Sequence, residues 1–300
     1  MKILAAIVTH NRRDLLSRCL DHLLTQKRPP DAILVINNAS TDGTIEMLQQ
    51  RDIPFVTQDN VGSAGGWHRG IAHGLEHEFD AVWLMDDDGF PDAAALAILE
   101  KRMMPGVAAV SSVVVREDDP TRFVFPFPLL NKALLPVIFG LPRKVATLEE
   151  LTAIAPNGFY PFAHLFNGAL ISLAAASKVG NVEQGFFMFG DEVDYFFRLR
   201  SAGSVLSVLD ALHFHPDVSK RPYSAAKVYY YTKNTLTLNK RYFNAVWLRH
   251  AIALVAVLSR TARRNGPGMV WSLVCGASAP SFYSAIARGL RGEVGKDFNG

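Results

Sequence analysis

Hydrophobic and polar residues alternate in blocks along the first half of the chain, and the blocks predict strands and helices in turn. Continuous apolar runs at residues 3–8 and 32–36 are typical of strands buried on both faces. Between them, residues 14–24 place leucines and Cys19 at helical spacing. Further apolar runs follow at residues 54–57 and 81–85. This alternation predicts an α/β fold with a mostly parallel central sheet and flanking helices.

The pattern breaks between residues 116 and 162, where proline and phenylalanine are dense. Because proline repeatedly stops regular elements, we expect an insertion or lid there, within a catalytic domain of residues 1–222. Residues 223–300 are expected to form a helical, basic C-terminal region. Its arginines flank apolar runs, a pattern typical of segments that dock on a membrane surface. The uncharged stretch 265–287 holds several glycines and prolines, so it is not a convincing membrane span.

The composition and the N-terminal sequence bear on the partners, the redox environment and the targeting of the protein. The net charge of +3 is too small to argue for a nucleic-acid partner. Two cysteines far apart suggest no disulfide framework, which favours a reducing cytoplasm. The N-terminus runs straight into a strand without a basic segment before it, so we expect no signal peptide. We therefore expect a cytoplasmic protein, peripheral on the inner face of the bacterial membrane if the basic tail docks. No feature indicates an oligomeric state.

Three adjacent carboxylates, Asp86, Asp87 and Asp88, directly follow the apolar run at residues 81–85. Ligands of such sheets bind at the carboxyl ends of the strands. Neighbouring carboxylates repel one another unless a cation or solvent compensates, and hard cations such as Mg²⁺ or Mn²⁺ prefer oxygen ligands. A solvated turn before the next helix is the alternative interpretation, and these residues alone leave both open.

A second acidic group, Asp191, Glu192 and Asp194, opens a later helical segment. The helix dipole favours one or two acids at this position, and three are more than it requires. A carboxylate is the usual base when a sugar is transferred to an alcohol. Nearby, His213 and His215 lie on the same side of a predicted strand, and one of them is a candidate metal ligand.

The glycine-rich segment 60–66 is predicted to form a loop whose backbone approaches a phosphate or a sugar. It matches neither the P-loop pattern nor the dinucleotide fingerprint. Taken alone, it is weak evidence for a nucleotide site.

Four segments, in this order along the chain, resemble family 2 glycosyltransferases with the GT-A fold: AAIVTHNR, VINNASTDGT, WLMDDD and FFMFGDEVDYFFR. The resemblance covers roughly residues 1–240. A narrower likeness is to the galactofuranosyl- and rhamnosyl-transferring branch, carried by NVGSAGGWHRG, DAVWLMDDDGFP and FNGALIS. The family resemblance implies an α/β protein with the GT-A nucleotide-diphospho-sugar transferase fold and a helical C-terminal tail.

The resemblance also implies roles for individual residues. The implied base is Glu192 or Asp191, and the implied metal ligands are Asp88, Asp86, His215 and His213. The donor-binding residues would be Thr9, Asn11, Arg12, Asn37, Asn60, Gly65, Gly66, Arg69, Asp86 and Asp87. The acceptor-binding residues would be Trp67, Asn167, Gly168 and Asp194. At two positions, this sequence differs from most members of the family. Asn37 stands where many relatives have Asp, and the order Asp191-Glu192 inverts the commoner Glu-Asp.

The implied function is metal-dependent, inverting transfer of galactofuranose or rhamnose from a UDP- or dTDP-sugar, with Mn²⁺ or Mg²⁺ as cofactor. The acceptor would be a hydroxyl of a glycan or of a lipid-linked substrate in cell-surface polysaccharide synthesis. Two other classes are weighed against it. An inactive scaffold that binds sugar nucleotides would not need both acidic groups intact. A phosphatase of the haloacid dehalogenase kind would carry its aspartates on the first strand, whereas here they follow the fourth.

Overall fold

The computed structural model describes residues 1–219 and 221–298, and the chain divides into two compact units. The first unit comprises residues 1–182 and 195–217. The second comprises residues 183–194 and the C-terminal part from residue 218 onward. The second unit therefore includes a segment, residues 183–194, from inside the region predicted as the catalytic domain.

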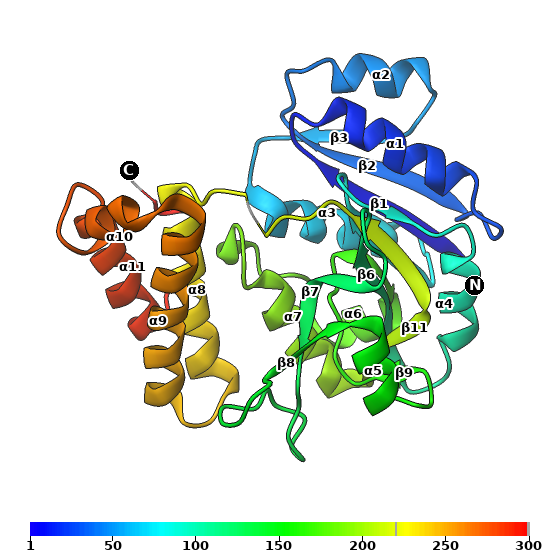
Figure 1. The fold of residues 1–300 in the computed structure, drawn as a ribbon. Coiled ribbons are helices and arrows are strands. Elements are labelled where there is room, and N and C mark those ends of the chain that lie inside the picture. Colours follow the sequence, from blue (N-terminus) through cyan, green and yellow to red (C-terminus); the bar gives the residue numbers. More distant parts are fainter. Residues whose placement is uncertain (220, 299–300) are drawn as a thin grey trace. The chain divides into compact units, whose positions relative to one another are not determined.

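The first unit is built on the predicted α/β sheet (Figure 1). Its strands are β1 (Ile3–Thr9), β2 (Ala32–Asn38), β3 (Phe55–Gln58), β4 (Ala81–Asp86), β5 (Phe90–Pro91), β6 (Val107–Arg116), β10 (Asn167–Ser172) and β11 (Ser204–His215). They lie in the order β3-β2-β1-β4-β10-β6-β11-β5. The long ladders that join β3, β2, β1 and β4, and the ladder of β6 with β11, are parallel. Strand β10 runs antiparallel between β4 and β6. The sheet is therefore mostly parallel, with antiparallel pairs from β10 onward.

Helices flank this sheet because their apolar residues recur at helical spacing. They are α1 (Arg13–Leu24), α2 (Thr44–Gln50), α3 (Gly62–Glu76), α4 (Ala95–Arg102) and α6 (Leu173–Val179). Leu16 and Leu20 of α1 are fully buried in one core cluster with Ile3 and Ile7 of β1. This burial holds β1 and α1 in place, so that Thr9 at the end of β1 and Arg12 directly before α1 have fixed positions.

The segment 116–162, expected as an insertion or lid, contains regular structure of its own. Its elements are β7 (Arg122–Pro128), β8 (Lys144–Thr147), α5 (Leu148–Ile154) and β9 (Phe159–Tyr160). Thr147 and Glu150 form a capping box that starts α5. Phe123, Phe127 and Leu151 are buried in a small core cluster together with Val113 of β6 and Leu209 of β11. The aromatic residues therefore pack against one another.

The second unit is helical, as the C-terminal sequence predicted. It contains the short helix η1 (Gln184–Phe186), the first turn of α7 (Asp191–Ala202), α8 (Ala225–Tyr242), α9 (Val246–Asn265), α10 (Pro267–Val274) and α11 (Ala279–Arg291). Val228, Val257, Leu273 and Phe282, one from each of α8 to α11, form its core. No single described helix is both long and apolar enough to cross a membrane, although α10 and α11, bent by 68°, pass that test as a pair.

Candidate active site

The three aspartates lie at the carboxyl end of β4, as the sequence predicted. Asp86 ends the strand and pairs in register with Val8 of β1. Asp87 and Asp88 are only 2% and 3% exposed. A solvated turn would expose these carboxylates, so their burial argues against that interpretation and requires a compensating positive charge.

Arg12 supplies part of that charge. Its Nη1 lies 2.9 Å from Asp87 Oδ1 and 3.0 Å from Asp88 Oδ2. Thr9 Oγ1 also donates a hydrogen bond of 2.7 Å to Asp87 Oδ2. Burial nevertheless raises the pKa of Asp87, with Arg12 and Thr9 acting in the opposite direction. Arg12 contacts two of the three carboxylates, and Arg18 Nη2 donates to the Asp88 carbonyl oxygen at 3.4 Å. Three neighbouring acidic groups at a strand end are oxygen ligands of the kind that hard cations prefer.

His215 contacts the same cluster from the end of β11. Its Nδ1 lies 2.7 Å from the Pro216 carbonyl oxygen, and its Nε2 lies 2.9 Å from Asp88 Oδ1. A carbonyl only accepts hydrogen bonds, so Nδ1 carries the hydrogen and Nε2 faces the carboxylate. Nε2 and Asp88 therefore require a shared proton or a shared metal cation. Orientation of a ligand histidine by a backbone carbonyl is common at metal sites, and this donor set fits Mn²⁺ or Mg²⁺.

The second histidine, His213, has different surroundings. It is fully buried, and an added Cβ would lie 2.3 Å from its Nε2 at Gly89 and 2.9 Å from its Nδ1 at Gly168. Two glycines thus make room for this ring. Burial lowers the pKa of His213 to about 3, so the ring stays neutral. Of the two candidate histidines, His215 is the one in contact with Asp88.

The expected base-pocket residues lie at the carboxyl ends of β1 and β2. Asn37 is fully buried and pairs in register with Thr9. Its Oδ1 accepts a hydrogen bond from the Ser40 backbone N–H at 3.0 Å. Asn11 Oδ1 accepts one from the Thr41 backbone N–H at 2.7 Å. The two asparagines therefore shape the segment between β2 and α2.

The glycine-rich segment lies largely inside helix α3, which corrects the predicted loop. The helix begins at Gly62, whose backbone N–H donates to Asn60 Oδ1 at 3.1 Å. Gly65 and Gly66 are buried in the helix, and an added Cβ on Gly66 would lie 2.5 Å from Val8 Cγ1. Gly66 therefore lets α3 pack closely against β1.

The remaining donor and acceptor candidates of the first unit differ in exposure. Arg69 is exposed on α3. Trp67 is 1% exposed, and its ring stacks on Phe166 at 4.7 Å. Asn167 is 7% exposed at the start of β10, next to Gly168, which has a φ of +88° at an irregularity of the strand. The buried indole is thus part of the core, whereas Asn167 pairs in register with Met85 beside the aspartates.

The second acidic group, Asp191, Glu192 and Asp194, forms the first turn of α7 in the second unit. The backbone before it is strained. Phe187 has φ +61° and ψ −60°, and the Met188 N–H donates to the Phe186 carbonyl oxygen at 2.7 Å. These values define a γ-turn in its rare positive-φ form. Phe189 also has a positive φ, +59°. Such strain persists only when neighbouring groups hold the segment.

Helix α8 supplies those groups. The Nδ2 of Asn234 lies within 2.9 Å of three carbonyl oxygens, those of Phe186, Met188 and Phe189. In the first turn of α7, Asp194 Oδ1 accepts hydrogen bonds from the Tyr242 hydroxyl at 2.6 Å and from Arg241 Nη1 at 3.1 Å. Asp194 is thus held by side chains of its own unit.

The sequence reasoning missed Asn234, Arg241 and Tyr242. They lie some fifty residues from the segment that they hold, inside a helix with no motif of its own. No local signal distinguishes them from ordinary polar residues of a helix.

The sheet carries buried carboxylates and an oriented imidazole at its strand ends. This architecture is typical of GT-A glycosyltransferases, which bind nucleotide sugars. The sequence profile of glycosyl transferase family 2 matches residues 5–156. The chain belongs to this family, and it is a glycosyltransferase.

Two similar relatives are galactofuranosyltransferases named GlfT1. The protein from Mycolicibacterium smegmatis is 33% identical over 221 residues, covering 71% of this chain and 70% of the relative. The protein from Mycobacterium tuberculosis is 36% identical over 224 residues, with the same coverage.

Solved structures support the fold. The mannosyltransferase PcManGT from Pyrobaculum calidifontis, in complex with GDP-Man and Mn²⁺, has a TM-score of 0.55 at 16% identity and covers 96% of this chain and 84% of its own. S. aureus TarS (residues 1–349) has a TM-score of 0.58 at 11% identity and covers 98% of this chain and 81% of its own. At these identities the likeness concerns the fold alone.

Proposed function

We propose that this protein transfers galactofuranose, with inversion, from its UDP-activated form to a hydroxyl of a cell-surface glycan or of its lipid-linked precursor. The observation that carries the proposal is the buried Asp87–Asp88 pair, with His215 Nε2 turned toward Asp88. The two GlfT1 relatives support galactofuranose as the sugar.

In this proposal, Asp88 and His215, with Asp86, hold a divalent cation, Mn²⁺ or Mg²⁺. When bound, that ion neutralises the charge that develops on the diphosphate. Arg12 and Thr9 fix the Asp87 carboxylate through the contacts described above. Asn11 and Asn37 hold the segment that contacts the base, and Asp86 lies near the ribose. The donor is thus bound by residues at the ends of β1, β2 and β4.

The proposed transfer step is a single displacement. Glu192 or Asp191 takes the proton of the acceptor hydroxyl, and the acceptor oxygen forms a bond to the anomeric carbon. The bond from that carbon to the diphosphate oxygen breaks on the opposite face, and UDP leaves with the electron pair. One carboxylate is enough, because the leaving group needs no acid.

Metal-dependent nucleotide binding tests the donor site. We expect isothermal titration calorimetry to show UDP binding that requires Mn²⁺. Asp88→Asn and His215→Ala should each weaken it by more than ~10-fold, since even outer-shell partners of a metal contribute that much. The control is Asp14→Asn, an exposed acid of α1 that pairs with Arg13. Equal UDP affinity with and without Mn²⁺ would contradict the proposal.

Two matched variants separate the candidate bases. We expect either Glu192→Gln or Asp191→Asn to lower kcat by roughly 10²–10⁴-fold, the usual contribution of a general base. Both variants should keep the Mn²⁺-dependent affinity for UDP, because the proposed donor ligands are elsewhere in the sequence. The assay is release of UDP from UDP-galactofuranose, with dTDP-rhamnose as the competing donor. Full turnover in both variants would exclude this segment as the source of the base.

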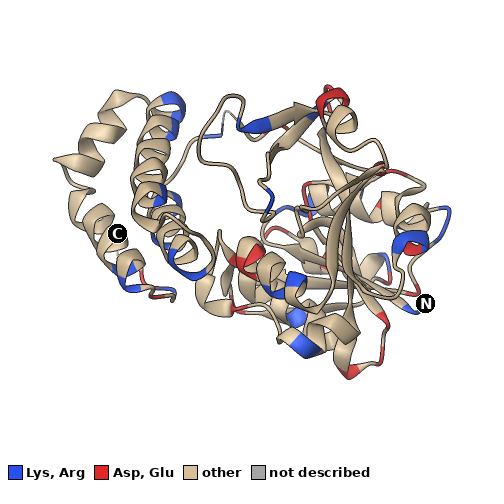
Figure 2. Ribbon diagram, turned by 90° about the horizontal axis from the view of Figure 1, so that it is seen from below, with Lys and Arg blue, Asp and Glu red and all other residues tan. Residues whose placement is uncertain are grey.

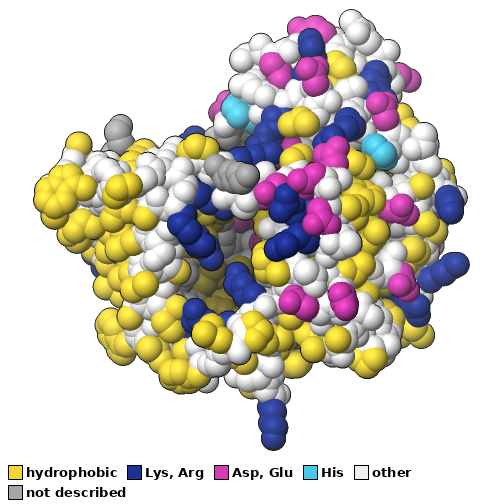
Figure 3. Space-filling view, in the orientation of Figure 1, with side chains coloured by type: hydrophobic (Ala, Val, Ile, Leu, Met, Phe, Trp, Pro, Cys, Tyr) yellow, Lys and Arg dark blue, Asp and Glu magenta, His cyan; other side chains and the backbone are white. Residues whose placement is uncertain are grey.

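We also propose that the second unit docks on the cytoplasmic face of a membrane, where a lipid-linked acceptor would be reached. Residues 223–300 hold eleven Lys or Arg against two acids. Figure 2 marks these basic positions on the C-terminal helices, and Figure 3 shows hydrophobic side chains gathered over the same helices. Trp247, Val255 and Trp271 are 78%, 65% and 69% exposed. Exposed aromatic and basic residues together favour an anionic lipid surface.

A further inference from the structure

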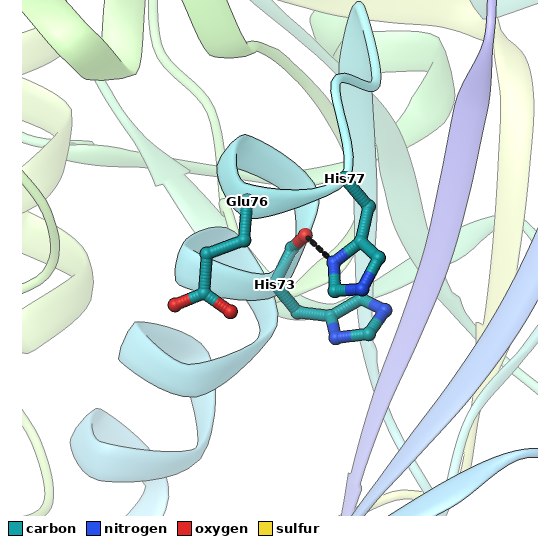
Figure 4. A group of neighbouring side chains, drawn as sticks. All are labelled: His73, Glu76 and His77. Carbon is teal, nitrogen blue, oxygen red and sulfur yellow. Dashed lines mark hydrogen bonds between the residues drawn. The ribbon is translucent and has the colours of Figure 1, made fainter.

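Two histidines and a glutamate lie close together at the last turn of helix α3, apart from the aspartate cluster (Figure 4). His73, Glu76 and His77 each offer one ligand atom, and these atoms lie within 4.8 Å of one another. Residues four apart occupy the same face of a helix, which brings the two imidazoles together. Their rings stack with centroids 4.0 Å apart. The lone pair of an imidazole lies in the plane of its ring, so the stacked rings and the carboxylate must rotate toward a common point to bind one ion.

Hydrogen bonding prepares one of these imidazoles for a metal. His77 Nδ1 lies 3.0 Å from the His73 carbonyl oxygen, which can only accept. Nδ1 therefore carries the hydrogen, and Nε2 presents its lone pair. Figure 4 shows this bond and both rings at the end of the helix. The same arrangement orients the ligand histidines of known metal sites.

The charge around His73 also suits a metal ligand. An imidazole binds a metal through the lone pair of its unprotonated nitrogen. The carboxylate of Glu76 and the negative end of the helix dipole favour a cation. The positive charge of Arg69 repels a cation from a distance. The Lys2 ammonium donates a hydrogen bond to the His77 carbonyl oxygen at 3.0 Å.

We propose that His73, Glu76 and His77 bind a borderline divalent transition-metal ion, with Zn²⁺ as the representative. Two imidazole nitrogens and one carboxylate oxygen suit Zn²⁺, Cu²⁺ or Ni²⁺ better than Mg²⁺ or Mn²⁺. The site is separate from the aspartate cluster. Helix α3 ends at Glu76 and leads into the start of β4, whereas the aspartates begin at the last residue of that strand.

The ion would stabilise the C-terminal turn of α3. After Glu76 the chain turns sharply: Glu78 has a φ of +54°, and the Phe79 N–H donates to the Gly74 carbonyl oxygen at 3.0 Å. A metal that bridges His73 and His77 holds the last helical turn just before this reversal. An ion that binds only the folded chain stabilises it by mass action.

Calorimetric titration with ZnCl₂ tests the site on the full chain, in excess Mg²⁺ to occupy the oxygen-rich aspartate cluster. We expect one equivalent of Zn²⁺ to bind. His77→Gln and His73→Gln should each lower that affinity by about tenfold or more, as even outer-shell partners of a metal contribute that much. Glu76→Gln should weaken it less. The control is His22→Gln, which changes a histidine in the last turn of another helix, α1, and should have no effect.

A second measurement distinguishes the loss of a metal ligand from a folding defect in these variants. Zn²⁺ should raise the Tm of the wild type and of His22→Gln, but not that of His77→Gln, whose exposed side chain can be changed without disturbing the core. Circular dichroism should show the wild-type helix content in every variant. Zn²⁺ binding of unchanged affinity in both histidine variants, or no Zn²⁺ binding by the wild type in excess Mg²⁺, would overturn the proposal.

Discussion

At the scale of single residues, burial decides which reactive groups are accessible. Cys19 is fully buried, and burial raises the pKa of its thiol, with the nearby Asp87 acting in the same direction. Cys275 is exposed. The thiolate is the reactive form, so we expect a thiol reagent such as DTNB to label one cysteine rapidly in the native protein and the second only after unfolding. Rapid labelling of native Cys275→Ser would contradict this assignment.

The glycines of α3 make a second prediction at this scale. An alanine at position 66 would place its Cβ 2.5 Å from Val8 Cγ1 and 2.8 Å from Val8 Cγ2, closer than side-chain carbons pack. We expect Gly66→Ala to lower the free energy of unfolding by ~1–3 kcal/mol, as overpacking does. Gly268→Ala is the control, because a Cβ there meets nothing within 4 Å. Urea denaturation measures both, and equal stability of the two variants would show that α3 shifts to accommodate the methyl group.

At the scale of elements, α8 positions the start of α7. Asn234→Ala removes the amide that holds three carbonyl groups of the strained turn before Asp191 and Glu192. If either acid is the base, as proposed above, kcat should fall on the order of 100-fold, the effect of a small misplacement of a catalytic group. The Mn²⁺-dependent affinity for UDP should not change.

The control for this prediction lies on the same helix. Asn239 is also buried, but its amide contacts His250 at 3.3 Å rather than the turn. Asn239→Ala should therefore leave kcat near the wild-type value. Tyr242→Phe, which removes a hydrogen bond to Asp194, should lower kcat in the same way as Asn234→Ala. Loss of UDP binding in Asn234→Ala would indicate general unfolding instead of mispositioning.

At the scale of the whole molecule, the proposed membrane docking makes a quantitative prediction. The protein should sediment with vesicles that contain anionic lipid, less so at high salt because the attraction is screened. Replacing Trp247 and Trp271 with serine should weaken binding by about tenfold or more, since burying a large apolar side chain contributes ~1.5–3 kcal/mol. Leu24→Ser, which changes a residue of the first unit that is 51% exposed, is the control. Binding that is insensitive to both tryptophans would exclude this surface.

Much of the fold could be predicted because its signals are local. The apolar run at residues 81–85 indicates a buried strand, and the three aspartates after it mark the strand end. The glycine-rich segment misled the prediction. Gly62, Gly65 and Gly66 resemble a loop in sequence, but they lie in the first turns of a helix, and the missing Cβ of Gly66 allows α3 to pack against Val8 of β1.

The sequence by itself determined the alternation of strands and helices up to β4, the acids at the end of β4 and at the start of α7, and the family. These features depend on periodicity and on short motifs, which act over a few residues. Only the tertiary structure decided that His215 rather than His213 contacts Asp88, and that Asn234 holds the turn before Asp191. Such pairings join residues 45 to 127 positions apart in the chain. They arise from packing, because a buried polar group must find its partner wherever the fold brings one.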